Sequence, residues 1–308
     1  MNAEIAAHYL DNAATTPVDP AVVDAMRPYF LKEYGNPSSL HSAGREAHRA
    51  MDRARAELAD YLRFEPDEIV FTAGATEANN LALVGRFFAE PTKRHIITCA
   101  TEHHAVLHTC DWLETQGARI TRLGVDDSGR IDPEEIEAEI TDDTLMVSVM
   151  TGNNEIGTLQ PIADIGRRCR AHGVPLHSDA VQAFGKIDIP SESCDFLSLS
   201  AHKFHGPKGV GVLAARRGFR LVPLLHGGGH EGGMRSGTEN IPGIVGLAHA
   251  ARLAIAAREA EHTRLAAFRR RIIAAVEELP GTRLNGHRDL CLPHIANFGF
   301  AAIEGESL

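Results

Sequence analysis

The stretch FLSLSAHKFHGPKG, residues 196–209, indicates both the fold and the chemistry of the chain. Its first four residues form an apolar run of the length of a buried strand. Lys203 follows that run closely and comes just before Gly206–Gly209, which breaks regular structure. Lys203 is therefore expected at the end of a strand. A lysine fixed in such a place can hold an aldehyde cofactor as a Schiff base. The alternative is a solvated surface charge, which is what most lysines near a Gly-Pro turn are.

Strand and helix signals alternate on both sides of this stretch. Asp19 and Asp132, each followed by a proline, predict helix N-termini, with Glu135 as the reciprocal acid of a capping box. The alternation predicts an α/β domain with a mostly parallel sheet, whose ligands collect at the carboxyl ends of the strands. The predicted strands are 69–71, 96–97, 119–123, 145–150, 175–177, 196–199, 210–214 and 295–300, and the predicted helices are 20–31, 44–62, 75–88, 105–116, 133 onward, 162–172 and 241–279.

The composition is that of an ordinary globular protein, with 44% hydrophobic and 23% charged residues. A formal net charge of -10 argues against a broad nucleic-acid or anionic-membrane surface, because phosphate binding needs clustered Lys and Arg. The start of the chain lacks a signal-peptide pattern and no apolar run is long enough for a bilayer, so a cytoplasmic protein is expected. The five cysteines show no Cys-x-x-Cys spacing, and Cys99 and Cys169 are expected to be buried free thiols.

The length of 308 residues exceeds the size at which single cores usually stop growing. We therefore predict two domains. Residues 17–250 are assigned to a large domain, and residues 1–16 together with 251–308 to a smaller α+β domain. The sequence stops at Leu308 without a capping or breaking signal, so the small domain is expected to be incomplete.

Polar residues follow several of the predicted strands. The turn Thr72–Glu77 opens a helix, so the amides around Ala75 and the Thr76 hydroxyl can hold a phosphate, although a plain Thr cap is the alternative. Asp179 can pair with a protonated pyridine nitrogen, which keeps the ring an electron sink, or can be a helix cap or surface acid. Gln182 shares a face with Asp179 if a helical turn begins there, and can reach the phenolic oxygen of the ring.

Further strand-end groups complete this set. His103 has the flat ring needed to stack over a pyridine and can move protons, although a lone histidine at a helix start is more often structural. Asn154 follows another strand, and Ser200 and His202 flank the lysine, where both can donate to a phosphate. Together these residues supply what one phosphorylated pyridine aldehyde requires.

The chain resembles the cysteine desulfurases of the NifS/IscS-like kind, in the class V aminotransferase group of pyridoxal-phosphate enzymes. The resemblance implies a fold-type-I transferase with pyridoxal 5'-phosphate bound to Lys203 as a Schiff base. It places Asp179 at the pyridine nitrogen, Gln182 and Asn154 near the phenolic oxygen, and His103 on the ring and as a proton carrier. The stretches that carry the likeness are 10–17, 71–77, 101–103, 153–157, 179–182, 200–203, 206–209, 226–231 and 234–240.

The resemblance also implies phosphate contacts and partners. Phosphate contacts fall to Thr76, Ser200 and His202, and Thr238 would reach the phosphate of a neighbouring subunit, so a homodimer is implied. The implied reaction removes sulfur from L-cysteine, leaves L-alanine and passes the sulfur as a protein persulfide toward iron-sulfur clusters or thio-cofactors. An iron-sulfur scaffold or another sulfur-acceptor protein is the implied partner.

Two parts of the family pattern are expected beyond the last residue, namely the loop with the nucleophilic cysteine and the arginine for the substrate carboxylate. Cys291 precedes a predicted strand and is not expected to replace that nucleophile. The chain by itself is therefore expected to form no persulfide. A selenocysteine lyase or another class V enzyme, and a cofactor-binding scaffold without catalysis, are the alternatives.

Overall fold

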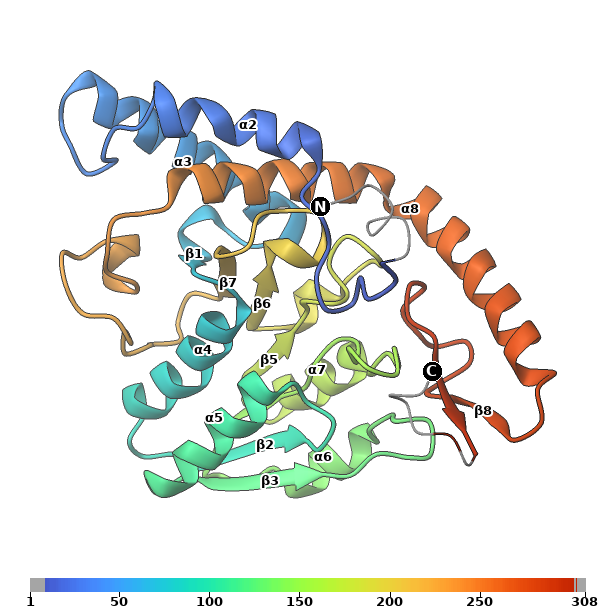
Figure 1. The fold of residues 1–308 in the computed structure, drawn as a ribbon. Coiled ribbons are helices and arrows are strands. Elements are labelled where there is room, and N and C mark those ends of the chain that lie inside the picture. Colours follow the sequence, from blue (N-terminus) through green and yellow to red (C-terminus); the bar gives the residue numbers. More distant parts are fainter. Residues whose placement is uncertain (1–8, 302, 304–308) are drawn as a thin grey trace.

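The fold is built on a seven-stranded sheet, seen in a computed structural model that describes residues 9–301 and 303 (Figure 1). The strand order is β1-β7-β6-β5-β4-β2-β3, and β7 alone runs antiparallel to its neighbours. The predicted α/β class with a mostly parallel sheet is confirmed. The strands are β1 (Ile69–Thr72), β2 (His95–Cys99), β3 (Arg119–Leu123), β4 (Thr144–Ser148), β5 (Leu176–Asp179), β6 (Phe196–Ser200) and β7 (Gly211–Ala215).

Alternating strand side chains supply two separate cores, one on each face of the sheet. Ile96 points into one core and Ile97 into the other, because successive side chains of a strand face opposite sides. Phe196 and Leu197 divide in the same way. All four side chains are inaccessible to solvent. Both faces of these strands are buried, which explains why they appear in the sequence as continuous apolar runs.

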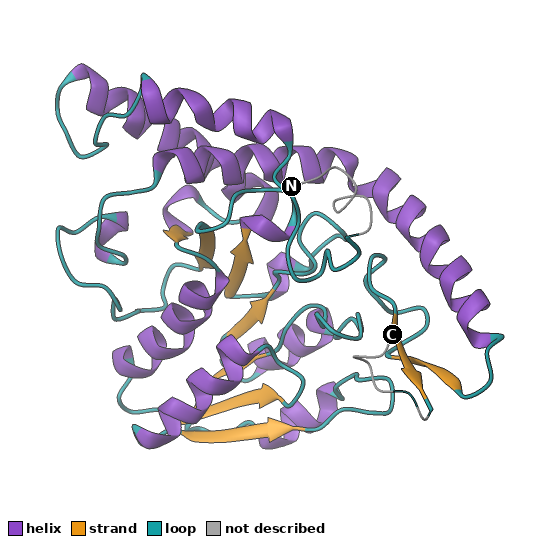
Figure 2. Cartoon of the chain, in the orientation of Figure 1, coloured by secondary structure: helices purple, strands orange, loops and turns teal. Residues whose placement is uncertain are grey.

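Helices cover both faces of the sheet, as Figures 1 and 2 show. Both predictions for the start of helix 20–31 are confirmed. Pro20 is its first residue, and the Asp19 carboxylate caps it by accepting a hydrogen bond from the N–H of Ala21. Among the described helices, none combines the length and the apolar character that a membrane crossing requires. The helices are α2 (Pro20–Leu31), α3 (Ser42–Leu62), α4 (Ala75–Ala89), α5 (His104–Thr115), α6 (Pro133–Glu139), α7 (Ile162–Ala171) and α8 (Ile241–Glu277).

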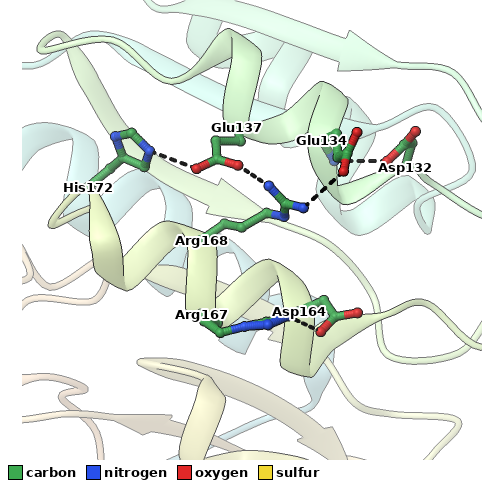
Figure 3. Close-up of polar contacts among 7 residues, drawn as sticks. All are labelled: Asp132, Glu134, Glu137, Asp164, Arg167, Arg168 and His172. Atoms are coloured by element: carbon green, nitrogen blue, oxygen red, sulfur yellow. Dashed lines mark hydrogen bonds and ion pairs between the residues drawn. The ribbon is translucent and has the colours of Figure 1, made fainter.

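The start of α6 departs from the predicted capping box. Asp132 caps the helix by accepting from the N–H of Glu134, but the described hydrogen bonds include none from the Asp132 N–H to the Glu135 carboxylate. The acids of α6 instead face α7, where Arg168 lies between Glu134 and Glu137 (Figure 3). Glu135, the acid expected to close the capping box, takes part in neither pair and is exposed. This charged cluster lies on the outside of the molecule, where such pairs add little stability.

The long helix α8 passes over the sheet and leads to a separate two-stranded sheet (Figure 1). It crosses the predicted boundary between residues 250 and 251 without a break, as expected of a connecting helix. The small sheet pairs β8 (Thr282–Asn285) with β9 (Asn297–Phe300) in antiparallel fashion. Sequence reasoning predicted β9, with an earlier start, and missed β8. The last predicted residues of the small domain, 302 and 304–308, lie outside the described residues.

Candidate functional site

A cavity of about 1170 Å³ opens at the carboxyl ends of β1, β2, β4, β5 and β6. The first strand belongs to this edge because β7, antiparallel to both β1 and β6, leaves those two parallel to each other. Nine of the ten residues assigned from the sequence line the cavity, which confirms that they lie together, although not what each one does. They are Ala75, Thr76, His103, Asn154, Asp179, Gln182, Ser200, His202 and Lys203.

Lys203 projects into the cavity from a single 3-10 turn, Ala201–Lys203, that follows β6 directly. Its ammonium donates to the carbonyl oxygens of Ala13 and Ala14, at 2.6 and 2.9 Å. The turn is also fixed from behind, because Thr16 donates to the His202 carbonyl at 2.9 Å from both its N–H and its hydroxyl. The lysine thus sits on a rigid support with its side chain directed at the segment before α2.

A second lysine supports the same turn. Lys186 donates from Nζ to the carbonyl oxygen of Lys203, at 2.7 Å. Burial, and then the charge of Lys203, lower the pKa of Lys186 to about 8. Burial also lowers the pKa of Lys203, against the opposing effect of nearby acids, chiefly Asp179. A larger fraction of the free amine follows, and the free amine is the form that attacks a carbonyl.

Asp179 is the last residue of β5, whereas the sequence predicted that this strand ends at His177. Its carboxylate accepts from Asn79 Nδ2 at 2.7 Å and from the N–H of Val181 at 3.0 Å. Burial raises the pKa of Asp179, while these donors and the charges of His103 and Lys203 oppose the rise. A carboxylate so far from water favours a cationic partner, which a protonated ring nitrogen can be.

The start of α4 lines the same cavity, near Ser200. The first N–H groups of a helix have no acceptor within the helix. Among the described hydrogen bonds, none is donated by the N–H of Ala75 or of Thr76. Gly74 precedes them, and a Cβ built there would meet only the Ser200 hydroxyl oxygen, at 3.8 Å. Gly211, on the neighbouring strand β7, lies so close to this turn that a Cβ built there would be 2.7 Å from Gly74 Cα.

His202 closes the same corner. Its Nδ1 lies 3.1 Å from the Thr15 hydroxyl oxygen. Burial, followed by the charges of Lys203 and Lys208, lowers the pKa of His202 to about 4. The imidazole is therefore neutral at physiological pH, so it can donate a hydrogen bond to an anion but adds no charge. The positive charge near this corner comes from the two lysines and from the helix end.

Three side chains line the remaining wall. His103 is exposed and caps α5, because its Nδ1 accepts from the N–H of Ala105 at 3.0 Å. The nitrogen left to carry a proton is therefore Nε2. Gln182 donates to the Ala13 carbonyl at 2.8 Å and contacts His294 Nε2 at 3.3 Å. Asn154 donates to the Glu155 carboxylate at 2.7 Å.

Thr238 is the one assigned residue outside this cavity. It is exposed and lines a separate cavity of about 160 Å³. Cys99 and Cys169 are buried free thiols, as predicted. Cys291 is partly buried, and burial raises the pKa of its thiol, the reverse of what activation requires. Among the described residues, none of the cysteines lines the main cavity.

Sequence reasoning missed several residues that hold this site together. Asn79, Lys186 and Glu102 all contact the assigned residues or the loops that carry them. Glu102 is buried and accepts from the N–H of Met150 at 2.6 Å, so it ties the loop of His103 to the end of β4. Glu102 lies in the stretch 101–103 beside His103, which was the only signal for it. Asn79 and Lys186 lie in no motif and are three and four residues from the nearest assigned residues, Thr76 and Gln182.

Known proteins share the sequence pattern and the fold of this chain. The family model Aminotransferase class-V matches residues 8–308. A cysteine desulfurase IscS of Methanosarcina thermophila is 48% identical over 311 residues, which cover 100% of this chain and 77% of the relative. Another from Dictyoglomus turgidum is 45% identical, covering 97% and 77%. Among solved structures, a NifS-like protein superposes with a TM-score of 0.94 at 40% identity, covering 97% of this chain and 83% of the other. SspA in complex with cysteine gives 0.77 at 44%, covering 79% and 72%.

Proposed function

The chain belongs to the class-V aminotransferase family, as its motifs predicted, and on that basis we propose that it is a cysteine desulfurase that uses pyridoxal 5'-phosphate. The observation that carries the proposal is the meeting of three groups in one cavity: the amine of Lys203, the buried Asp179 carboxylate and the free amides that open α4. When bound, the cofactor supplies an electron sink for the pair released at the α-carbon of an amino acid.

The residues of the cavity fit that cofactor at both ends. The amides of Ala75 and Thr76, with the Ser200 hydroxyl and His202, combine a helix N-terminus with neutral donors in this cavity, and they would hold the phosphate. Asp179 would keep the proton on the ring nitrogen, since a cation removes the cost of its buried charge. Gln182 and Asn154 would lie toward the phenolic oxygen.

Lys203 would hold the cofactor covalently and then take the α-proton of the substrate. Its lowered pKa suits both tasks, because each one needs the neutral amine. His103 would stack on the ring and move a proton at the substrate sulfur through the nitrogen that does not cap α5. The substrate is L-cysteine, in keeping with the named relatives and with the cysteine complex of SspA. In the complete family reaction alanine would leave and the sulfur would pass to a cysteine thiolate and on to an acceptor protein; among the described residues, no cysteine lines the cavity to serve as that thiolate.

Thr238 supports a homodimer within this proposal. It is exposed and lies outside the cavity that its own subunit would use for the phosphate. A threonine placed there can serve the phosphate of a second copy, which completes each site across an interface. The assignment of residues 17–250 to the large domain and of 1–16 and 251–308 to the small one is likewise proposed.

The test is the absorbance of the purified protein with pyridoxal 5'-phosphate. We expect Lys203→Ala to lose the visible band of the lysine-bound cofactor, and Lys208→Ala to keep it, because Lys208 lines the same cavity but is exposed. A lysine-bound band in Lys203→Ala would refute the assignment. Alanine release from cysteine, compared with release from selenocysteine, separates the desulfurase from a selenocysteine lyase.

A further inference from the structure

Two histidines on α5 form an exposed pair beside the main cavity. His104 and His108 are four residues apart, which places them on one face of the helix, one turn from each other. Their ring centroids lie 4.8 Å apart and their planes differ by only 7°. Both side chains are exposed, and the helix lies on the outside of the fold (Figure 1). The proposed function uses neither residue.

The surroundings of the pair suit a cation. A shallow cavity of about 450 Å³ includes both rings, and its lining contains no lysine, arginine or acid. In the part of the chain that the structure describes, no hydrogen bond occupies a ring nitrogen of His104 or His108. A neutral imidazole with an unoccupied nitrogen is the form that binds a metal.

We propose that His104 and His108 form a surface site for a divalent transition-metal ion, which binds Cu²⁺ most tightly. Two histidines with this spacing on a helix can hold one ion between them, as in helical zinc motifs. Imidazole suits zinc, nickel and copper, and the general order of affinities places Cu²⁺ first. Among the described residues, no group of three or more His, Cys, Asp or Glu side chains gathers for a metal, so water would fill the remaining positions.

The position of the site gives it a relation to the main cavity. Thr76, Asn80 and His103 line both the large cavity and the shallow one. An ion held by His104 and His108 would therefore stand at the mouth of the large cavity, beside His103, whose ring centroid is 6.2 Å from that of His104. The proposal does not depend on the cofactor or on the reaction.

Trp112 provides a direct readout of binding. It is the only tryptophan of the sequence, it lies one turn beyond His108 on the same helix, and it lines the same shallow cavity. Paramagnetic Cu²⁺ quenches a nearby indole. We expect a titration of the full chain with Cu²⁺, near neutral pH and without thiol reagents, to quench the fluorescence of Trp112 with saturation at one equivalent, and a chelator to restore it.

The variants distinguish this site from other copper contacts. His104→Ala and His108→Ala should each raise the half-saturating Cu²⁺ concentration about 100-fold, since the second ligand of a chelating pair acts at a high effective concentration. His262→Ala is the matched control: it is exposed on helix α8 and has Arg258 and Ala266, not histidine, four residues away. Its titration should equal that of the parent protein.

Three results would overturn the proposal. They are quenching that rises without saturation, quenching that both α5 variants retain at the parental concentration, and quenching that His262→Ala removes. Circular dichroism of each variant checks that α5 remains folded. Because both rings are exposed, their removal leaves no cavity in the core, and we expect unchanged spectra.

Discussion

Replacing Lys186 by methionine tests how the turn of Lys203 is supported. The side chain of Lys186 donates to the Lys203 carbonyl at 2.7 Å, and burial lowers its pKa from an ordinary 10.5 to about 8. A pKa change of this size corresponds to about 3 kcal/mol, at about 1.4 kcal/mol per pKa unit. The folded protein bears that cost at neutral pH, because it must either bury the charge or release the proton.

The sign of the effect follows from proton binding. Between pH values of about 8 and 10.5 the unfolded chain holds the Lys186 proton more tightly than the folded chain, so stability rises with pH. Between about pH 7 and about pH 9 the wild type should gain about 1.3 kcal/mol relative to Lys186→Met from this group. At neutral pH the two proteins should differ little, since the methionine removes a cost of about 3 kcal/mol but leaves the Lys203 carbonyl unpaired, at about 1–3 kcal/mol.

The assay is urea unfolding of the cofactor-free full chain at several pH values, with the difference between the two proteins as the measured quantity. Lys93→Met is the matched control, because Lys93 also donates to a backbone carbonyl, that of Thr144, at 3.3 Å. We expect the Lys93 variant to track the wild type across the range. The reasoning is refuted if the free energy of unfolding of Lys186→Met also changes with pH in parallel with that of the wild type.

Two further substitutions probe the supports of the cavity by urea unfolding. Burial holds the pKa of Glu102 well above its ordinary value, which favours the neutral acid, and Glu102→Gln keeps an oxygen acceptor for the Met150 N–H, so it should retain stability at neutral pH. Glu102→Ala should lose about 1–3 kcal/mol, because a buried N–H loses its acceptor; equal losses in both variants would contradict this. Gly211→Ala should cost about 1–3 kcal/mol, since the added Cβ would lie 2.5 Å from the Leu199 carbonyl oxygen and 2.7 Å from Gly74 Cα. Gly124→Ala, with no atom within 4 Å, is its control and should be neutral.

The sequence predicted β1, β2, β4, β5 and β6 well because these strands are buried on both faces, whereas β3 is partly exposed. Runs such as 145–150 and 196–199 are apolar without alternation, which is typical of parallel strands between two helical layers. The strand β8 was missed for the opposite reason. Thr282–Asn285 is short, contains an arginine and is partly exposed, so neither an apolar run nor a clear alternation marks it. Its pairing with β9 defines it, and pairing is not local in the sequence.

The candidate site was predictable where polar residues follow strands directly, as at Asp179 and Lys203. Parallel topology brings the carboxyl ends of strands together, so a local pattern is enough to place those residues in one cavity. Asn79 could not be found in this way. It lies on the second turn of α4, and its contact with Asp179 joins positions 100 residues apart. Only the packing of α4 against the sheet creates that contact.

The segment before α2 shows how far the site depends on contacts of this second kind. The carbonyl of Ala13 accepts from both Gln182 and Lys203, over separations of 169 and 190 residues. Thr16 binds the same turn through the carbonyl of His202. One side of the cavity therefore forms only when the beginning of the chain docks onto the ends of β5 and β6. Because Ala13 and Ala14 supply the acceptors of the Lys203 ammonium, the direction of that side chain also depends on contacts that are distant in the sequence.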